Sequence, residues 1–187
     1  MFLAAVSNVP GAAKIALVAC EQEKVAKRNS KYKKKGDKYL ADRKVDGEFY
    51  REMLVQQVFP AIEDKLLDPA LPKFIAPVWH QTDNAPPHVA VKTASFRESY
   101  AEDGNIMPHP NPQAPRCPES NVLDMSVFNW MQQSVDAAHC ITRDDIKKAT
   151  FAAWEEMPES VILNSFGHLA SVHETIVKNK GGNNTNQ

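Results

Sequence analysis

An apolar run that leads directly into polar residues is the strongest constraint on how this chain can fold. The run spans residues 74–79, and Asp83, Asn84, two prolines and His88 follow it. A short apolar run of this kind is typical of a buried strand, and in α/β sheets functional sites form where strands end. We therefore expect a strand over residues 74–79 that places Asp83 at an edge of a sheet.

A second carboxylate lies at the predicted start of a helix. A proline-containing loop ends at Asp124, and helical apolar spacing then begins at Val127, Phe128 and Met131. Carboxylate oxygens prefer Mg²⁺ or Mn²⁺ to zinc, so Asp83 and Asp124 are candidate ligands for two divalent cations. Such a metal pair activates a water or a 3′-hydroxyl and stabilises the leaving oxygen in phosphodiester transfer.

Each acid also has a purely structural interpretation. Asp83 followed by Asn84 is a turn-forming pair, because both side chains can hydrogen-bond to nearby backbone. A carboxylate in the first turn of a helix, as expected for Asp124, is stabilised by the helix dipole. The residues by themselves leave the metal site and the structural roles open.

The composition is that of a single globular domain. The chain has 187 residues, of which 43% are hydrophobic, and its formal net charge is −1. This is enough apolar material for a core, and the charge excludes a strongly basic nucleic-acid binder on global grounds. Three widely spaced cysteines without a C-x-x-C pair favour a reducing intracellular compartment. No apolar run approaches the roughly 18 residues that span a bilayer, so we expect no membrane partner.

Positive charge is concentrated in one segment of the chain. Residues 24–44 contain ten Lys or Arg against two acids, a local charge of +8. A loop or hairpin arm with this charge can neutralise DNA phosphates, whereas the alternative is a solvated loop without a partner. The candidate DNA-binding residues are Lys31, Lys33, Lys34, Lys35 and Lys38.

The order of predicted elements is that of an α/β fold in which helices cover a mixed sheet. Strands are expected over residues 1–7, 14–20, 74–79 and 105–109, and Pro10-Gly11 separates the first two. Asp46 caps a helix that buries Phe49, Met53, Val58 and Ile62. Further helices are expected over residues 88–99, 123–135, 143–157 and 161–178. We expect the three tryptophans, Trp79, Trp130 and Trp154, to pack in the core.

Two blocks of this sequence resemble the catalytic motifs of Tc1/mariner-type transposases. Asp-Asn-Ala-Pro-Pro-His at residues 83–88 resembles their D-N-A-x-x-H block, and Pro-Glu-Ser-Asn-Val-Leu-Asp at 118–124 resembles their S-P-D-x-N-x-x-D/E block. The blocks occur in the family's order, with 40 residues between the two acids. The following residues, 125–132, resemble a helix of the plant and oomycete mariner-like subgroup. The resemblance covers most of the chain and is to the C-terminal part of the catalytic domain.

The resemblance implies an RNase H-like fold, a mixed sheet flanked by helices, over residues 1–178, followed by a disordered tail at 179–187. It implies that Asp83 and Asp124 are the second and third acids of a DDD triad, which holds two Mg²⁺ or Mn²⁺ ions in the intact parent. Asn84 and His88 would support the metal site from outside the ligand set, although His88 can equally be a packing residue at a helix start. The partners implied are DNA and, in the intact parent, a second copy. The location implied is the nucleus.

The chain departs from the family at its first acid. That acid lies on a strand preceding the one expected at residues 1–7, and no residue of this chain occupies its position. We therefore expect the sheet to lack its first strand and the chain to be inactive, because the metal pair loses a bridging ligand. Glu119 and Cys117 also replace the usual Asp and Ser of the second block. The alternatives are a non-enzymatic DNA-binding or protein-interaction module derived from a transposable element, and an unrelated metal-dependent hydrolase.

Overall fold

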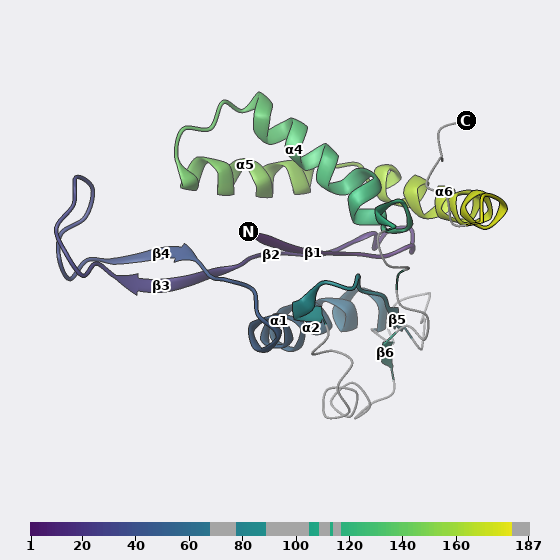
Figure 1. The fold of residues 1–187 in the computed structure, drawn as a ribbon, viewed down its shortest axis with the longest axis horizontal. Coiled ribbons are helices and arrows are strands. Elements are labelled where there is room, and N and C mark those ends of the chain that lie inside the picture. The colour runs from purple at the N-terminus through teal and green to yellow at the C-terminus, as the bar shows by residue number, and fades with distance from the viewer. Residues whose placement is uncertain (68–77, 89–104, 109–112, 114–116, 181–187) are drawn as a thin grey trace.

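An antiparallel hairpin lies at the centre of the molecule (Figure 1). The structure is a computed structural model that describes residues 1–67, 78–88, 105–108, 113 and 117–180. Strand β1 (Phe2–Val6) pairs with β2 (Lys14–Ala19), as expected from the two apolar runs. In the connection, Gly11 has a φ of +83°, a backbone conformation that favours glycine. The Pro10-Gly11 pair therefore ends the first strand as predicted.

A continuous helical segment follows from Asp46, whose side chain accepts the Phe49 N–H at 2.9 Å. It consists of α1 (Gly47–Met53), the π-helical turn η1 (Leu54–Val58), α2 (Phe59–Ile62) and the π-helical turn η2 (Glu63–Leu67). Pro60 has no N–H to donate and its ring crowds the preceding turn, so the wider turn η1 lies immediately before it. The predicted helix and its cap are confirmed.

Three helices complete the described chain. After the 3₁₀ turn η4 (Pro118–Ser120), the π-helical turn η5 (Leu123–Val127) continues into α4 (Phe128–Ala137), and α5 (Arg143–Glu156) and α6 (Glu159–Lys178) follow. Thr142 and Asp145 form a capping box at the start of α5, which satisfies two backbone N–H groups. The three C-terminal helices predicted from the sequence are confirmed.

Helices cover both faces of the central hairpin. Figure 1 shows α4, α5 and α6 on one side of β1 and β2, and α1 and α2 on the other. Side chains alternate along a strand, so Leu3 packs against the first helical segment while Ala4 packs against the C-terminal helices. The two resulting cores are centred on Leu54 and Val58 in one layer and on Val127 and Ile162 in the other.

The basic segment forms a second hairpin that extends away from the helices (Figure 1). Strand β3 (Glu21–Val25) pairs antiparallel with β4 (Lys38–Asp42), and the loop between them forms the tip. We call residues 21–42 the basic arm. Of the two forms predicted for this segment, the structure has the hairpin arm.

The strands do not form the single mixed sheet that the sequence predicts. Strand β5 (Val78–His80) pairs in parallel with β6 (Ile106–Pro108), and the described strands make three two-stranded sheets. Among the described residues, no hydrogen-bonded ladder joins the pair β1–β2 to the pair β5–β6.

Several predictions concern residues outside the described chain, namely 74–77 of one strand, 89–99 of one helix and the tail at 181–187. Trp154 is buried as predicted, but Trp79 exposes 50% of its surface. The core prediction for Trp79 is wrong because β5 lies at the periphery of the described structure (Figure 1). No helix of the described chain is both long enough and apolar enough to cross a bilayer.

Candidate metal-binding site

The Asp83 carboxylate is fixed by its own loop. It lies three residues after β5, and its Oδ1 accepts the Ala85 N–H at 2.8 Å. The same oxygen pairs with Nδ1 of His88, which a turn of 3₁₀ helix at residues 86–88 brings back toward the strand. The turn-forming role predicted for Asp83 is therefore real. It is compatible with metal binding, because the contacts to Ala85 and His88 both use Oδ1 of this carboxylate.

His88 is held between Asp83 and an aromatic ring. Its imidazole lies on Tyr50 of α1, with 4.2 Å between ring centroids, and its side chain is 19% exposed. Burial raises the pKa of the Tyr50 phenol and the negative charge of Asp83 raises it further, so this phenol stays neutral at physiological pH. The contacts support the packing role that the sequence left open for His88. Tyr50 was not among the predicted core residues, although its spacing with Leu54 and Val58 places it on one helical stripe.

The His80 side chain packs against an aromatic ring of the first helical segment. It is half-buried at the end of β5, and its ring meets that of Phe59 edge to face with 6.1 Å between centroids. Loss of water contact and, to a smaller extent, the neighbouring His88 together lower the pKa of the His80 imidazole to about 4. This imidazole is therefore neutral at physiological pH.

Asp124 lies in the first turn of η5, where Asn121 positions it. The Asn121 amide donates to Oδ2 of Asp124 at 2.9 Å, while its carbonyl oxygen accepts the Leu123 N–H at 3.0 Å. Partial burial raises the pKa of the Asp124 carboxyl, and the charge of Asp83 raises it further, against the opposing effect of the Asn121 hydrogen bond. The two predicted acids therefore lie near enough to repel each other, which is the electrostatic condition that a shared cation relieves.

A hydrogen-bond chain connects the two motif blocks. The Asn84 side chain donates to the backbone carbonyl of Gln113 at 2.6 Å, and the buried Gln113 side chain donates to the Cys117 carbonyl at 2.7 Å. The Ser120 hydroxyl donates to the same carbonyl at 2.8 Å. Asn84 thus links the Asp83 loop to the segment before the second motif block. Gln113 has the connecting role, and nothing in its proline-rich surroundings indicates this from the sequence.

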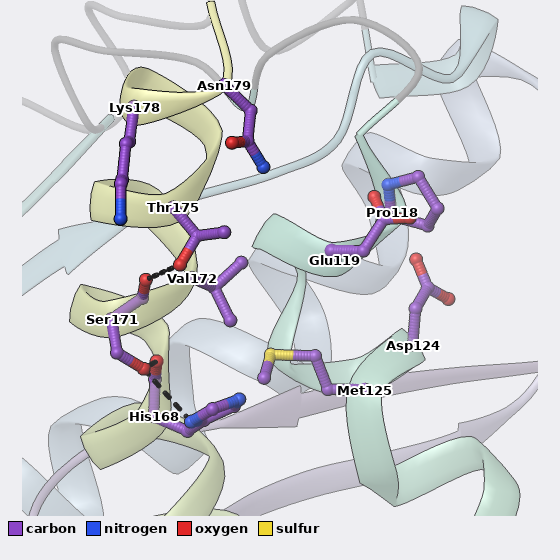
Figure 2. A pocket seen from close by; sticks show the side chains of 10 residues that line it. All are labelled: Pro118, Glu119, Asp124, Met125, His168, Ser171, Val172, Thr175, Lys178 and Asn179. Atoms are coloured by element: carbon purple, nitrogen blue, oxygen red, sulfur yellow. Dashed lines mark hydrogen bonds between the residues drawn. The ribbon is translucent and has the colours of Figure 1, made fainter. Parts of the chain in front are cut away.

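A cavity of about 620 Å³ opens beside Asp124 (Figure 2). Pro118, Glu119 and Met125 line it together with Asp124, and α6 forms the facing wall with His168, Ser171, Val172 and Thr175 among its residues. One carboxylate oxygen of Glu119 is buried without a hydrogen-bond partner among the described residues. The cavity gives Asp124 access to solvent-borne ligands.

The donor set is chemically suited to Mg²⁺ or Mn²⁺ but is incomplete. Asp83 and Asp124 supply carboxylate oxygens, which hard divalent cations prefer. Within the described ranges, no group of three or more His, Cys, Asp or Glu side chains is placed to hold a metal ion. The site therefore provides two carboxylates and would leave the remaining coordination positions to water or substrate.

The tip of the basic arm, which carries most of the predicted DNA-binding lysines, lies far from the strand that precedes Asp83. Figure 1 shows the tip of the basic arm at one end of the molecule and β5, which precedes Asp83, at the other. The five lysines are not equivalent. Lys33 lies over the Tyr39 ring, 3.3 Å from its centroid, and Lys38 pairs with Glu23 at 3.0 Å. Lys31, Lys34 and Lys35 are exposed.

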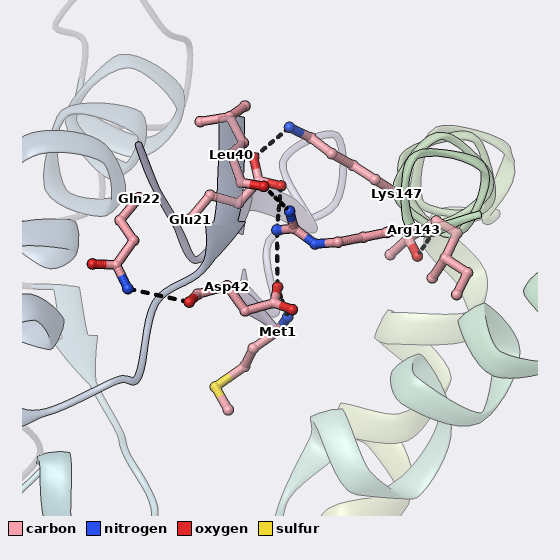
Figure 3. A network of polar contacts seen from close by, with 9 residues as sticks. Met1, Glu21, Gln22, Leu40, Asp42, Arg143 and Lys147 are labelled. Atoms are coloured by element: carbon pink, nitrogen blue, oxygen red, sulfur yellow. Dashed lines mark hydrogen bonds and ion pairs between the residues drawn. The ribbon is translucent and has the colours of Figure 1, made fainter. Parts of the chain in front are cut away.

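A network of charges fixes the base of the basic arm (Figure 3). Arg143 of α5 donates to the Leu40 carbonyl at 2.6 Å, to Glu21 at 2.8 Å and to Asp42 at 3.0 Å. Lys147, one helical turn further along, contacts Glu21 at 2.5 Å. The sequence predicts α5 but gives no sign that it anchors the arm.

Comparison with solved structures identifies proteins of similar fold. The catalytic domain of Mos1 mariner transposase superposes with a TM-score of 0.59 at 19% identity, over 78% of this chain and 68% of that one. The Mos1 transposase paired-end complex with left transposon end gives a TM-score of 0.57 at 18% identity, over 78% of this chain and 40% of that one. No protein-family model and no curated protein sequence matches the chain. The described α/β fold is thus similar to that of a mariner transposase catalytic domain.

Proposed function

We propose that this chain derives from the catalytic domain of a mariner-like transposase of the plant and oomycete subgroup. The parent activity is metal-dependent cleavage and strand transfer of DNA. The observation that carries the proposal is that the two motif blocks, which contain Asp83 and Asp124, are joined through Gln113 within a fold similar to that catalytic domain. The effect of the Asp83 charge on Asp124 supports the same assignment.

In the proposed site, Asp83 and Asp124 hold the divalent cations, Mg²⁺ or Mn²⁺. When bound, the cations would activate the attacking water or 3′-hydroxyl and neutralise the departing oxygen. His88 orients Asp83 through Oδ1, and Asn121 orients Asp124 through Oδ2. Asn84 connects the loop that carries Asp83 to the segment before the second motif block. These contacts use Oδ1 of Asp83 and Oδ2 of Asp124, so the other oxygen of each carboxylate is the one proposed to bind a cation.

These 187 residues supply two acids of a three-acid site, so we expect them to bind metal weakly and not to cleave DNA. In the proposed parent a third carboxylate would help to hold the metals, and a site without it would lack a ligand needed to position them for phosphodiester cleavage. DNA as partner, a nuclear location and pairing of two copies in the parent belong to the same proposal. They are supported by the resemblance and, for DNA, by the exposed lysines of the basic arm.

The metal assignment is tested by the effect of Mn²⁺ on thermal unfolding. A ligand that binds only the folded state at about 100 times its Kd stabilises it by about 2.7 kcal/mol. We expect Mn²⁺ to raise the Tm of the wild type and to have little effect on Asp83→Asn or Asp124→Asn. The matched control is Asp144→Asn, an exposed acid on α5 outside the site, which should keep the wild-type response.

Two results would contradict this assignment. One is an Mn²⁺-induced rise in Tm that is the same in Asp83→Asn, Asp124→Asn and the wild type. The other is nicking of supercoiled DNA in Mn²⁺ that survives both substitutions. Nicking by the wild type that both substitutions abolish would confirm the site while showing that the chain is active.

A second candidate function is a DNA-binding module without catalysis. The exposed side chains of Lys31, Lys34 and Lys35 on an arm anchored to α5 favour it. The measurement is the dependence of duplex DNA affinity on salt, which should be steep because each neutralised phosphate releases counterions. Steep salt dependence together with no metal effect on Tm would favour this function over the first.

A further inference from the structure

The tip of the basic arm is an ordered loop. The Ser30 N–H donates to the Lys33 carbonyl at 2.8 Å, and the Ser30 hydroxyl accepts the Lys33 N–H at 3.2 Å, so Lys31 and Tyr32 occupy the turn between them. The Asp37 side chain accepts the Lys34 N–H at 2.7 Å, and the Asn29 side chain accepts the Lys35 N–H at 2.8 Å. The tip therefore has its backbone hydrogen bonds satisfied internally and presents its side chains outward.

Tyr32 is the most exposed aromatic side chain of the described chain, with 81% of its surface accessible. The other tyrosine of the arm, Tyr39, provides an internal comparison, because it is half-buried on β4 and carries Lys33 over its ring. Tyr32 has only the more distant Lys31 ammonium, 5.3 Å from its ring centroid. One tyrosine of the arm is thus packed within the protein, while the other offers a ring face to a ligand.

The charges around Tyr32 restrict the chemistry of that ligand. Three exposed lysines flank it, namely Lys31, Lys34 and Lys35. The nearest acid in sequence, Asp37, accepts a hydrogen bond from the Lys34 backbone N–H. A partner must therefore carry negative charge and a flat ring that can stack. Single-stranded nucleic acid has both, because its phosphates bind cations and its unpaired bases stack on aromatic side chains. Duplex DNA offers the phosphates but keeps its base faces within the stack.

We infer that the tip of the basic arm binds single-stranded DNA, with Tyr32 stacked on an unpaired base and Lys31, Lys34 and Lys35 on the flanking phosphates. The inference rests on the proposed function in taking DNA as the partner. The Arg143 network holds the base of the arm, so the tip is presented in one orientation. The tip of the basic arm and β5, the strand that precedes Asp83, lie at opposite ends of the molecule (Figure 1), so the tip and the proposed metal site would contact different parts of a strand.

The test compares two labelled strands of about 12 nucleotides, within the range of known single-strand sites. One strand is oligo-dT, and the other has the same phosphates but lacks bases at its central positions. Fluorescence anisotropy on the whole 187-residue protein should show tighter binding of oligo-dT, by about 5- to 150-fold for one stacked base. Tyr32→Ala should abolish this difference, and Tyr32→Phe should keep it because the ring remains.

The charge control is the double variant Lys34→Gln/Lys35→Gln. It should weaken binding of both strands alike and reduce the slope of log affinity against log salt by about 1.4, the value for two phosphate contacts on single-stranded DNA. A Tyr32→Ala protein that still prefers oligo-dT as the wild type does would overturn the stacking role and leave DNA as the partner. Failure of the wild type to bind either strand or duplex DNA would overturn both the inference and the DNA-binding part of the proposed function.

Discussion

Asp124 and Lys34 are both charged side chains in the two proposed binding regions, yet their surroundings differ in almost every respect. Asp124 is hydrogen-bonded by Asn121 and feels the like charge of Asp83. Lys34 is exposed on a loop whose hydrogen bonds come from the backbone and from Asn29, Ser30 and Asp37. The region around Asp83 and Asp124, which we call the carboxylate end, therefore brings like charges together at a cost in free energy that a bound cation would relieve. The basic arm holds its charges in water, where their repulsion is weak.

This difference implies that the two regions depend on the rest of the protein in different ways. Asp83 is positioned by His88, which rests on Tyr50 in the core under the central hairpin. The basic arm instead touches the body mainly through polar contacts at its base, to Arg143 and Lys147. Truncating a core side chain should therefore disrupt the carboxylate end, whereas removing charged side chains should disrupt the arm.

The largest expected effect comes from Leu54→Ala. Leu54 is 1% exposed and packs in the same cluster as Tyr50, so its truncation should cost about 2–5 kcal/mol of unfolding free energy. Leu40→Ala is the matched control on the arm, because Leu40 is 54% exposed and its carbonyl contact to Arg143 is kept. That variant should stay within about 0.5 kcal/mol of the wild type in urea denaturation. Equal losses of unfolding free energy in the two variants would contradict the proposed difference between the core and the arm.

Between pH 6.5 and 4, acid should destabilise the region around Asp83 and His80 more than the arm, because the arm contains no histidine. The folded protein lowers the pKa of His80 to about 4 from 6.5, so the folded state binds fewer protons than the unfolded state between these values. The stabilising contribution is present above about pH 6.5 and is lost as pH falls toward 4, by at most about 3 kcal/mol.

The measurement is unfolding free energy against pH for the wild type and for His80→Gln, which cannot take up a proton. His80→Gln should show a shallower loss of stability between pH 6.5 and 4, and the exposed His173→Gln should follow the wild type. Identical pH profiles for the wild type and His80→Gln would show that this imidazole is not held neutral by the fold.

A smaller effect is expected for Arg143→Met. The substitution removes three polar contacts at the base of the arm and leaves Glu21, whose side chain is 13% exposed, with Lys147 alone. Because Arg143 is itself 36% exposed, we expect a loss of only about 1–2 kcal/mol at low salt, and less at high salt. Hydrogen exchange should accelerate in β3 and β4 but not in α1. Lys148→Met, an exposed lysine on the same helix, is the control.

Features that depend on neighbouring residues could be predicted from the sequence. Asp46 caps its helix, Pro10-Gly11 ends β1, and the C-terminal helices begin and end near the expected residues. In each case the signal lies within a few positions of its structural consequence, as a capping side chain, a turn residue or an apolar repeat.

Features that depend on contacts between distant segments could not be predicted. Arg143 meets Glu21 across 122 positions, and no local pattern distinguishes it from any basic residue at the start of a helix. Lys33 and Lys34 are neighbouring lysines that the sequence does not distinguish. Only the fold shows that Lys33 packs over the ring of Tyr39 on β4. The motif blocks single out Asp83 and Asp124 as candidate acids, but the connecting role of Gln113 became apparent only with the fold.

The amino group of Met1 takes part in the network at the base of the arm, 3.3 Å from the Asp42 carboxylate. Any residue joined in front of Met1, including a purification tag, converts this ammonium group into a neutral amide. Asp42 then keeps Arg143 as its cationic partner, and the start of β1 is no longer tied to the end of β4 by this ion pair. Proteins for measurements on the arm should therefore carry their tags at the C-terminus or have them removed without leaving extra residues.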